Sequence, residues 1–319
     1  MRRFAFLLFA GAALLASPAH ATWPERTVTF IVPASAGTAL DAAARIVAER
    51  LTRIWGQPVI IENKVGAGGT LGTEYTRRLP PDGYSLLFAA PTHYISKYLY
   101  ASATFDPVAD FEPVARTGVA HMVLLVKADS KYRSLGDIID AAKAHPDQLT
   151  YSSAGVGTFS HLAAVMLENL AGIKLRHIPY KDAGLAVTDV LGGRIDLTFT
   201  AVTTAAGQVG PDMARPIATS GEKRSRTMPD VPTLAESGIP KYAILSWNEI
   251  VAAKGVPDTI LEKVSKDVGE VLSNDDTITR LEKAGVEVNY IPWQELRKSA
   301  PAENEKWHQL VIDSGAQQQ

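Results

Sequence analysis

The chain has 319 residues, of which 46% are hydrophobic and 21% are charged, and its 32 Lys and Arg nearly balance its 34 Asp and Glu. This is the composition of an ordinary globular protein that is long enough for two compact lobes. Because no basic run occurs, nucleic acid is not expected as a partner. The chain contains no Cys, which excludes disulfides, thiol catalysis and a lipid anchor attached through a cysteine.

The first residues have the pattern of an export signal. Arg2 and Arg3 precede an apolar run over 4–15, and Ala19-His20-Ala21 has the small residues of a cleavage site. The apolar run is shorter than the roughly 20 residues that a membrane-spanning helix needs. The sequence therefore predicts a signal peptide at 1–21 and a mature protein that diffuses freely in the periplasm.

Strand-like and helix-like segments alternate after the signal. The pattern predicts strands at 27–32, 59–61 and 84–89, with helices at 38–54 and 74–79 between them. The run at 59–61 is continuously apolar, as in a parallel strand that is covered on both faces. Such an alternation is typical of a right-handed parallel α/β sheet.

A second α/β run follows an extended segment at 114–127. The pattern predicts helices at 135–144, 158–170 and 183–191, and strands at 149–152, 176–179 and 195–199. Another extended segment, 244–252, precedes helices at 260–272, 276–283 and 293–310. We therefore expect two α/β lobes joined by two hinge strands, with lobe one at 22–121 plus 246–319 and lobe two at 122–245.

Three strand-to-helix loops carry the candidate binding residues, because open parallel sheets bind ligands at the carboxyl ends of their strands. In the first loop, small side chains allow a ligand to approach backbone N–H groups at a helix N-terminus. The alternative is a plain turn in which Thr38 or Asp41 only supports the helix. The candidates in this loop are Ser35, Ala36, Gly37, Thr38 and Asp41.

The other two loops supply hydroxyl and imidazole groups. Thr92 and His93 follow a buried strand, although a single His is more often structural. The loop at 152–161 combines hydroxyls and glycines before a helix, and its alternative is that Thr158 caps the helix while His161 packs on the first turn. The candidates in this third loop are Ser153, Ala154, Gly157, Thr158 and His161.

Enzyme motifs are absent from the sequence. It contains no G-x-S-x-G elbow, no dinucleotide or phosphate-binding glycine fingerprint and no H-E-x-x-H, and its seven His show no metal-ligand spacing. The absence of these motifs makes an enzyme less expected. A hydrolase using Ser153 or Ser160 with His161 is the enzymatic alternative, but adjacent residues on a helix point in different directions.

Eight stretches in order resemble the Bug/TctC family, the substrate-binding components of tripartite tricarboxylate transporters. The resemblance covers essentially the whole mature chain. The stretches are WPER at 23–26, GQPVIIEN at 56–63, GAGG at 66–69, PDGY at 81–84, SAG at 153–155 with GT at 157–158, HIPYK at 177–181, LGG at 191–193 and MPDVPT at 228–233.

The resemblance implies a two-lobed periplasmic binding protein fold, similar to type II, that holds a ligand carboxylate in the first loop while lobe two closes over the far end. It implies a monomer, without catalysis, metal or cofactor, that delivers a small organic carboxylate to the membrane components of a transporter. A periplasmic sensor that signals to a membrane receptor is an alternative. Where many members carry an Asp, this chain has Thr200. The loss of that carboxylate favours a dicarboxylate or an aromatic carboxylate over an acidic amino acid.

Overall fold

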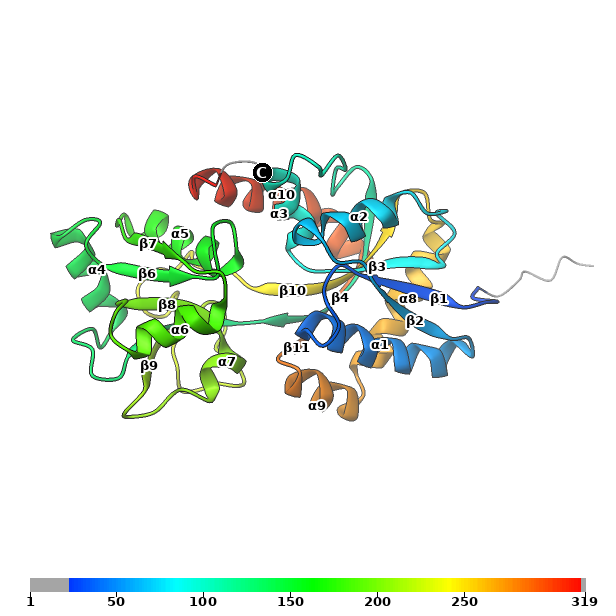
Figure 1. Ribbon diagram of the computed structural model, residues 1–319. Coiled ribbons are helices and arrows are strands. Elements are labelled where there is room, and N and C mark those ends of the chain that lie inside the picture. Colours follow the sequence, from blue (N-terminus) through cyan, green and yellow to red (C-terminus); the bar gives the residue numbers. More distant parts are fainter. Residues whose placement is uncertain (1–22, 317–319) are drawn as a thin grey trace, which may run out of the picture.

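Two mixed β-sheets organise the computed structural model, which describes residues 23–316. One sheet has six strands in the order β11-β4-β10-β3-β1-β2, and the other has five in the order β7-β6-β8-β5-β9. Helices flank each sheet, and the two resulting lobes lie side by side (Figure 1). We call the lobe of the six-stranded sheet lobe one and that of the five-stranded sheet lobe two. The chain has the predicted two-lobed α/β fold.

Lobe one takes its strands from both halves of the chain. Its strands are β1 (Val28–Val32), β2 (Val59–Asn63), β3 (Ser85–Ala89), β4 (Phe111–Ala120), β10 (Ser246–Ala253) and β11 (Glu287–Pro292). Its helices are α1 (Ala39–Trp55), α2 (Thr70–Arg77), α3 (Thr92–Leu99), α8 (Asp258–Leu272), α9 (Asp275–Lys283) and α10 (Trp293–Asp313), with a 3-10 turn at Ala67–Gly69.

Lobe two is built from the middle of the chain. Its strands are β5 (Met122–Lys127), β6 (Thr150–Ser153), β7 (Arg176–Pro179), β8 (Leu197–Ala201) and β9 (Ala214–Thr219). Its helices are α4 (Leu135–Ala144), α5 (Phe159–Ala171), α6 (Ala183–Leu191) and α7 (Val202–Ala206). The predicted bounds of α4, β7 and α6 are confirmed. The division into lobes at 121/122 and 245/246 stays a proposal, which the membership of the two sheets supports.

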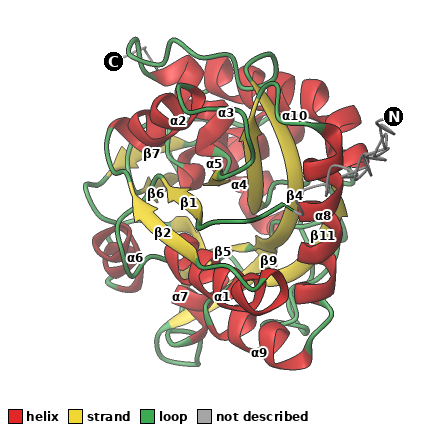
Figure 2. Ribbon diagram, turned by 90° about the vertical axis from the view of Figure 1, so that its right-hand side faces the viewer, coloured by secondary structure: helices red, strands yellow, loops and turns green. Residues whose placement is uncertain are grey.

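Alternation along the strands explains why helices cover both faces of the lobe-one sheet. Phe30 and Phe88 belong to the core that includes α1 and α8, whereas Leu87 and Trp247 belong to the core that includes α3 and α10. Figure 2 shows these helices on either side of the strands. The second core continues into lobe two through α10, whose Trp307 ring lies 5.7 Å from the ring of Phe159.

Three expectations about strands need correction. The extended segment at 114–127 is two strands, because at His121 the chain leaves one sheet and enters the other. Strand β2 is not covered on both faces: it is the edge of its sheet, and Ile60 is 49% exposed. The strand expected at 195–199 begins at Leu197 and runs to Ala201.

The periodicity also missed some elements. Helix α3 begins at Thr92, so the segment expected to be a loop there is already helical. Strands β9 and β11 were not predicted, because they are defined by pairing with β5 and β4, which lie far away in the chain. No helix within residues 23–316 is long and apolar enough to cross a bilayer. The expected signal peptide lies outside the described residues.

Candidate functional site

The first strand-to-helix loop lies on the side of lobe one that faces lobe two (Figure 1). Residues Ser35 to Thr38 are exposed, and Thr38 is the N-cap of α1. The Thr38 hydroxyl donates to the carbonyl of Ser35 at 2.9 Å and accepts the N–H of Asp41 at 3.4 Å. The loop therefore presents backbone at the start of a long helix, where the helix dipole favours an anion.

The buried side chain of Asp41 holds this loop in place by hydrogen bonds. The side chain is 3% exposed and accepts the N–H of Gly37 at 2.9 Å, two hydrogen bonds from Arg45 at 2.9 and 3.0 Å, and one from Asn63 Nδ2 at 2.9 Å. Asn63 Nδ2 also donates to the carbonyl of Ala34 at 2.9 Å. The hydrogen bond from Arg45 holds the pKa of Asp41 at about 2. The carboxylate of Asp41 thus stays ionised and hydrogen-bonded within the protein, and it positions the loop.

The two candidate residues at the start of α3 differ in their exposure to solvent. Thr92 is exposed, whereas His93 is 3% exposed and stacks on Phe105 with ring centroids 5.9 Å apart. Its Nε2 lies 3.3 Å from the carbonyl of Pro107. Burial lowers the pKa of His93 to about 4. The imidazole is packed as a neutral core group, and we leave it out of the proposed site.

The loop between β6 and α5 is closed by its own hydroxyls. Thr158 precedes α5, and its hydroxyl donates to the carbonyl of Gly155 at 2.7 Å instead of capping the first turn. Ala154 donates its N–H to Ser160 Oγ at 3.1 Å, which lies 3.2 Å from Thr158 Oγ1. The alternative considered for this loop, that the Thr158 side chain caps the helix, is therefore wrong.

Three aromatic rings support the same loop. The rings of His161 and His177 stack at 4.1 Å, and Tyr151 stacks on His177 at 4.7 Å. His161 Nδ1 accepts the N–H of Gly157 at 3.0 Å. Gly157 has a φ of +75°, and a Cβ there would lie 2.6 Å from Leu99 of lobe one. His161 therefore packs on the first turn of its helix, and Gly157 allows the lobes to approach.

Ser153 does not have the geometry of a nucleophile. The residue is 1% exposed. Its hydroxyl lies 2.6 Å from Nε2 of His177 and accepts the N–H of Gly155 at 3.1 Å. A substrate cannot reach a hydroxyl that is buried and bonded in this way. The arrangement supports the loop and gives no basis for hydrolysis.

A pocket of about 320 Å³ opens beside the α5 N-terminus, and we call it the lobe-two pocket. Of the predicted residues, Ala154, Thr158 and Thr200 line it. All of its lining residues belong to lobe two. The lining is Met122, Ala154, Thr158, Phe159, Ser160, Ala183, Ala186, Thr198, Phe199, Thr200, Ala201 and Thr204.

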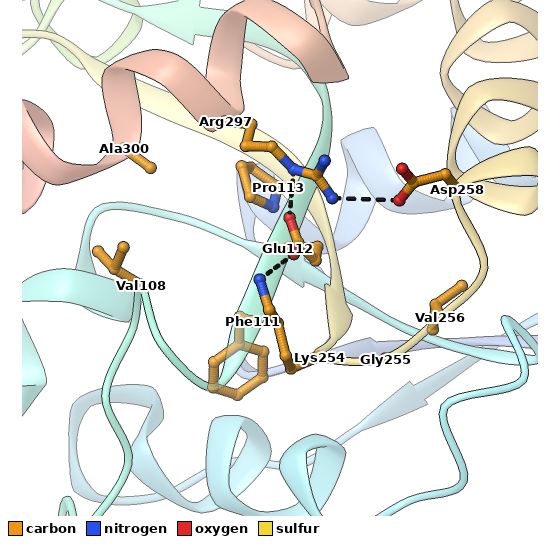
Figure 3. Close-up of a pocket in the computed structure, with 10 residues that line it drawn as sticks. All are labelled: Val108, Phe111, Glu112, Pro113, Lys254, Gly255, Val256, Asp258, Arg297 and Ala300. Carbon is orange, nitrogen blue, oxygen red and sulfur yellow. Dashed lines mark hydrogen bonds and ion pairs between the residues drawn. The ribbon is translucent and has the colours of Figure 1, made fainter.

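Another pocket, of about 510 Å³, lies at the far end of β4 in lobe one. Figure 3 shows Glu112 between Lys254 and Arg297, and Arg297 also reaches Asp258 at 3.2 Å. These cations are already paired with carboxylates, and the pocket is at the end of β4 away from the hinge. We do not regard it as the ligand site.

Sequence analysis missed a contact between the lobes at the β11 edge of the lobe-one sheet. Glu287 of β11 accepts the hydroxyl of Ser225 at 2.5 Å and the N–H of Arg226 at 2.9 Å, both from the segment after β9. His121, where the chain crosses between the lobes, has its Nε2 3.6 Å from Glu287. We call Glu287, Ser225 and Arg226 the hinge latch. No local signal could reveal it, because its two sides are about 60 residues apart.

Burial of His93 predicts an acid sensitivity that is separate from ligand binding. Burial lowers the pKa of the imidazole from its usual 6.5 to about 4 on folding. The stability of the folded protein is therefore unaffected by this group above pH 6.5 and decreases as the pH falls from 6.5 toward 4, because only the unfolded state takes up the proton there. The full difference corresponds to about 3.5 kcal/mol, at about 1.4 kcal/mol per pKa unit.

The His93→Phe variant should therefore show a flatter decline of the thermal midpoint between pH 6.5 and 4 than the parent. The same change at exposed His145 should leave the decline unaltered. Ligand affinity at pH 7.5 should be unchanged in both variants; a clear loss in His93→Phe alone would return this residue to the binding site.

Metal binding has no evident location in the described residues. Within residues 23–316, no group of three or more His, Cys, Asp or Glu side chains is placed to hold an ion. The arrangement instead offers two strand-to-helix loops, one from each lobe, and a pocket between the helices of lobe two.

Comparison with known proteins agrees with this arrangement. Residues 43–315 match the family described as the tripartite tricarboxylate transporter family receptor. The UPF0065 protein in the gbd 5′ region of Cupriavidus necator is 32% identical over 98% of both chains. The structure of the periplasmic binding protein BugD is 31% identical, with a TM-score of 0.72 over 93% of this chain and all of the other.

Some of the similar structures were solved with a small carboxylate bound. A protein of R. palustris solved with adipate is 28% identical, with a TM-score of 0.74 over 92% of this chain and 98% of the other. Members of the matched family are receptors that bind and are not enzymes. The chain thus belongs to the Bug/TctC family of periplasmic solute-binding receptors of tripartite tricarboxylate transporters.

Proposed function

We propose that the mature chain is an exported periplasmic receptor without a lipid anchor. It captures a small organic carboxylate, a dicarboxylate or an aromatic carboxylate, between its lobes. It acts as a monomer, without metal or cofactor, and delivers the ligand to the membrane components of a tripartite tricarboxylate transporter. The structure solved with adipate supports the ligand class for a relative.

The observation that carries this proposal is the loop from Ser35 to Thr38. This loop is exposed and precedes a helix of 17 residues. Hydrogen bonds from its backbone to Asp41, and from Asn63 to the carbonyl of Ala34, hold it in place. A carboxylate on this loop would receive backbone N–H groups at the positive end of the helix dipole. Ser35, Ala36, Gly37 and Thr38 therefore form the proposed lobe-one half of the site, with Thr92 nearby and Asp41 as its support.

The lobe-two half consists of the lining residues Ala154, Thr158 and Thr200, with Ser153, Gly157 and His161 shaping the loop around them. A ligand that contacts both halves binds the closed arrangement better than the open one, and thereby shifts the population toward closure. The closed, ligand-bound protein presents a different surface from the open, empty protein. The membrane components can therefore distinguish a loaded receptor from an empty one.

A thermal-shift screen of the mature protein tests the proposal. The panel holds mono-, di- and tricarboxylates, aromatic acids and amino acids, and titration calorimetry follows each hit. We expect a carboxylate to raise the thermal midpoint and to bind one per chain without being altered. Stabilisation by amino acids alone would contradict the proposed ligand class, and the absence of any response to carboxylates would contradict the proposed function.

A further inference from the structure

The lobe-two pocket has an unusual lining for a protein that binds an anion. Within the described residues, every side chain that lines it is uncharged. Large apolar groups come from Met122, Phe159 and Phe199, and alanines on α6 leave space beside them. Met122 adds a polarisable sulfur, which makes favourable contacts with aromatic rings. The interior of the pocket is therefore suited to a flat apolar group.

Most hydroxyls of the pocket are already used by the protein. Thr158 donates to the carbonyl of Gly155 at 2.7 Å, and Thr198 donates to the carbonyl of Ser152 at 3.0 Å. Ser160 accepts the N–H of Ala154 at 3.1 Å. The hydroxyls of Thr200 and Thr204 are the ones that can hydrogen-bond to a ligand in this pocket. Two hydroxyls can satisfy one neutral polar group, but they cannot neutralise a second carboxylate.

The charged residues nearest to the pocket along the chain do not supply a counterion. Lys181 is exposed and lies outside the lining. Asp182 accepts the N–H groups of Gly184 and Leu185 at 2.8 and 3.1 Å, and so caps α6. The N-terminus of α5 supplies partial positive charge at the mouth of the pocket, which offsets only part of the cost of desolvating a full negative charge.

We infer that the lobe-two pocket receives the uncharged ring of an aromatic monocarboxylate, and that this chain binds such an acid in preference to a dicarboxylate. The inference rests on the proposed function, in which the single carboxylate lies on the lobe-one loop. It narrows the ligand class because the far end of the ligand meets Phe159, Phe199 and Met122 and no cation. Thr200 and Thr204 accommodate at most a neutral polar substituent on the ring.

Titration calorimetry with matched ligands tests the inference. The pair is 4-methylbenzoate and benzene-1,4-dicarboxylate, which have similar shapes and differ by one charge at the far end; adipate is the aliphatic dicarboxylate. We expect 4-methylbenzoate to bind at least tenfold more tightly than either dicarboxylate. Tighter binding of a dicarboxylate would overturn this inference and leave the proposed function intact, whereas no binding of any carboxylate would overturn both.

A variant that adds a cation provides the second arm. Thr204 is exposed and lines the pocket, so Thr204→Lys should raise affinity for benzene-1,4-dicarboxylate and narrow or reverse the tenfold preference. The matched control is Ala206→Lys, which places the same charge on the same helix outside the lining. An equal effect of both lysines, or no effect of Thr204→Lys, would show that the pocket does not contact the far end of the ligand.

Discussion

Replacing Asp41 with Asn is expected to weaken ligand binding about tenfold and to lower the free energy of unfolding by about 2 kcal/mol. The pKa of Asp41 falls from 3.8 to about 2 on folding, which corresponds to about 2.5 kcal/mol at about 1.4 kcal/mol per unit. The partner Arg45 is 51% exposed, and solvent screening therefore reduces this value. Asn keeps the shape of the side chain but turns an amide N–H toward a guanidinium.

The loss of affinity follows from the position of the loop. Asp41 accepts the N–H of Gly37, and together with Asn63 it holds the backbone against which the carboxylate is proposed to lie. A loop that is free before binding must be ordered by the ligand, and this cost appears as weaker affinity. The measurements are calorimetric titration at pH 7.5 and urea unfolding of the same preparations.

The control for this prediction is Asp140→Asn, which removes a carboxylate from an exposed position on α4. It should change neither quantity. An Asp41→Asn protein that unfolds more easily but binds its ligand as tightly as the parent would show that the first loop is not part of the binding site.

Removal of the Glu287 side chain is expected to tighten ligand binding about fivefold to tenfold. Glu287 of the hinge latch lies on β11, an edge strand that β4 and β10 separate from β3 and β1 in the sheet, and the proposed lobe-one loops follow β1 and β3. We expect a rotation about the hinge strands that closes those loops on a ligand to separate Glu287 from Ser225 and Arg226. On this expectation the latch favours the open arrangement of the lobes.

The expected effect is smaller than the sum of the two contacts, because Ser225 and Arg226 can hydrogen-bond to water once the latch is open. A net loss of about 1 to 1.4 kcal/mol corresponds to a fivefold to tenfold change in affinity. Glu287→Ala should raise the fraction of closed protein and thereby lower the apparent dissociation constant. Calorimetry gives the affinity, and small-angle scattering of the ligand-free protein should show a smaller radius of gyration.

Two further variants separate the latch from a general effect on charge. Ser225→Ala removes one of the two contacts from the lobe-two side and should produce a smaller change in the same direction. Glu262→Ala removes an exposed carboxylate of α8 and should be silent. If Glu287→Ala weakens binding while the scattering profile is unchanged, the latch does not control opening.

Periodicity was sufficient for most of the fold and for the location of the candidate loops. The apolar stripe from Leu40 to Ile54 predicted α1 because residues three and four apart share a helix face. The same local reasoning failed at 114–127, since an extended segment has the same sequence pattern in either sheet. Two strands are recognised there only because β4 pairs with β10 in one sheet and β5 pairs with β8 in the other. It also failed at β11, a strand defined by its partner β4.

The sequence by itself determined the order of strands and helices, the small residues of the loop before α1 and the family, because each depends on residues close together in the chain. The tertiary structure decided what those residues do. It packs His93 in the core, commits Asp41 to the loop, and pairs Ser153 with His177 across 24 positions and Ser225 with Glu287 across 62. Burial and pairing between distant segments arise only when the chain folds, and they set which groups remain free for a ligand.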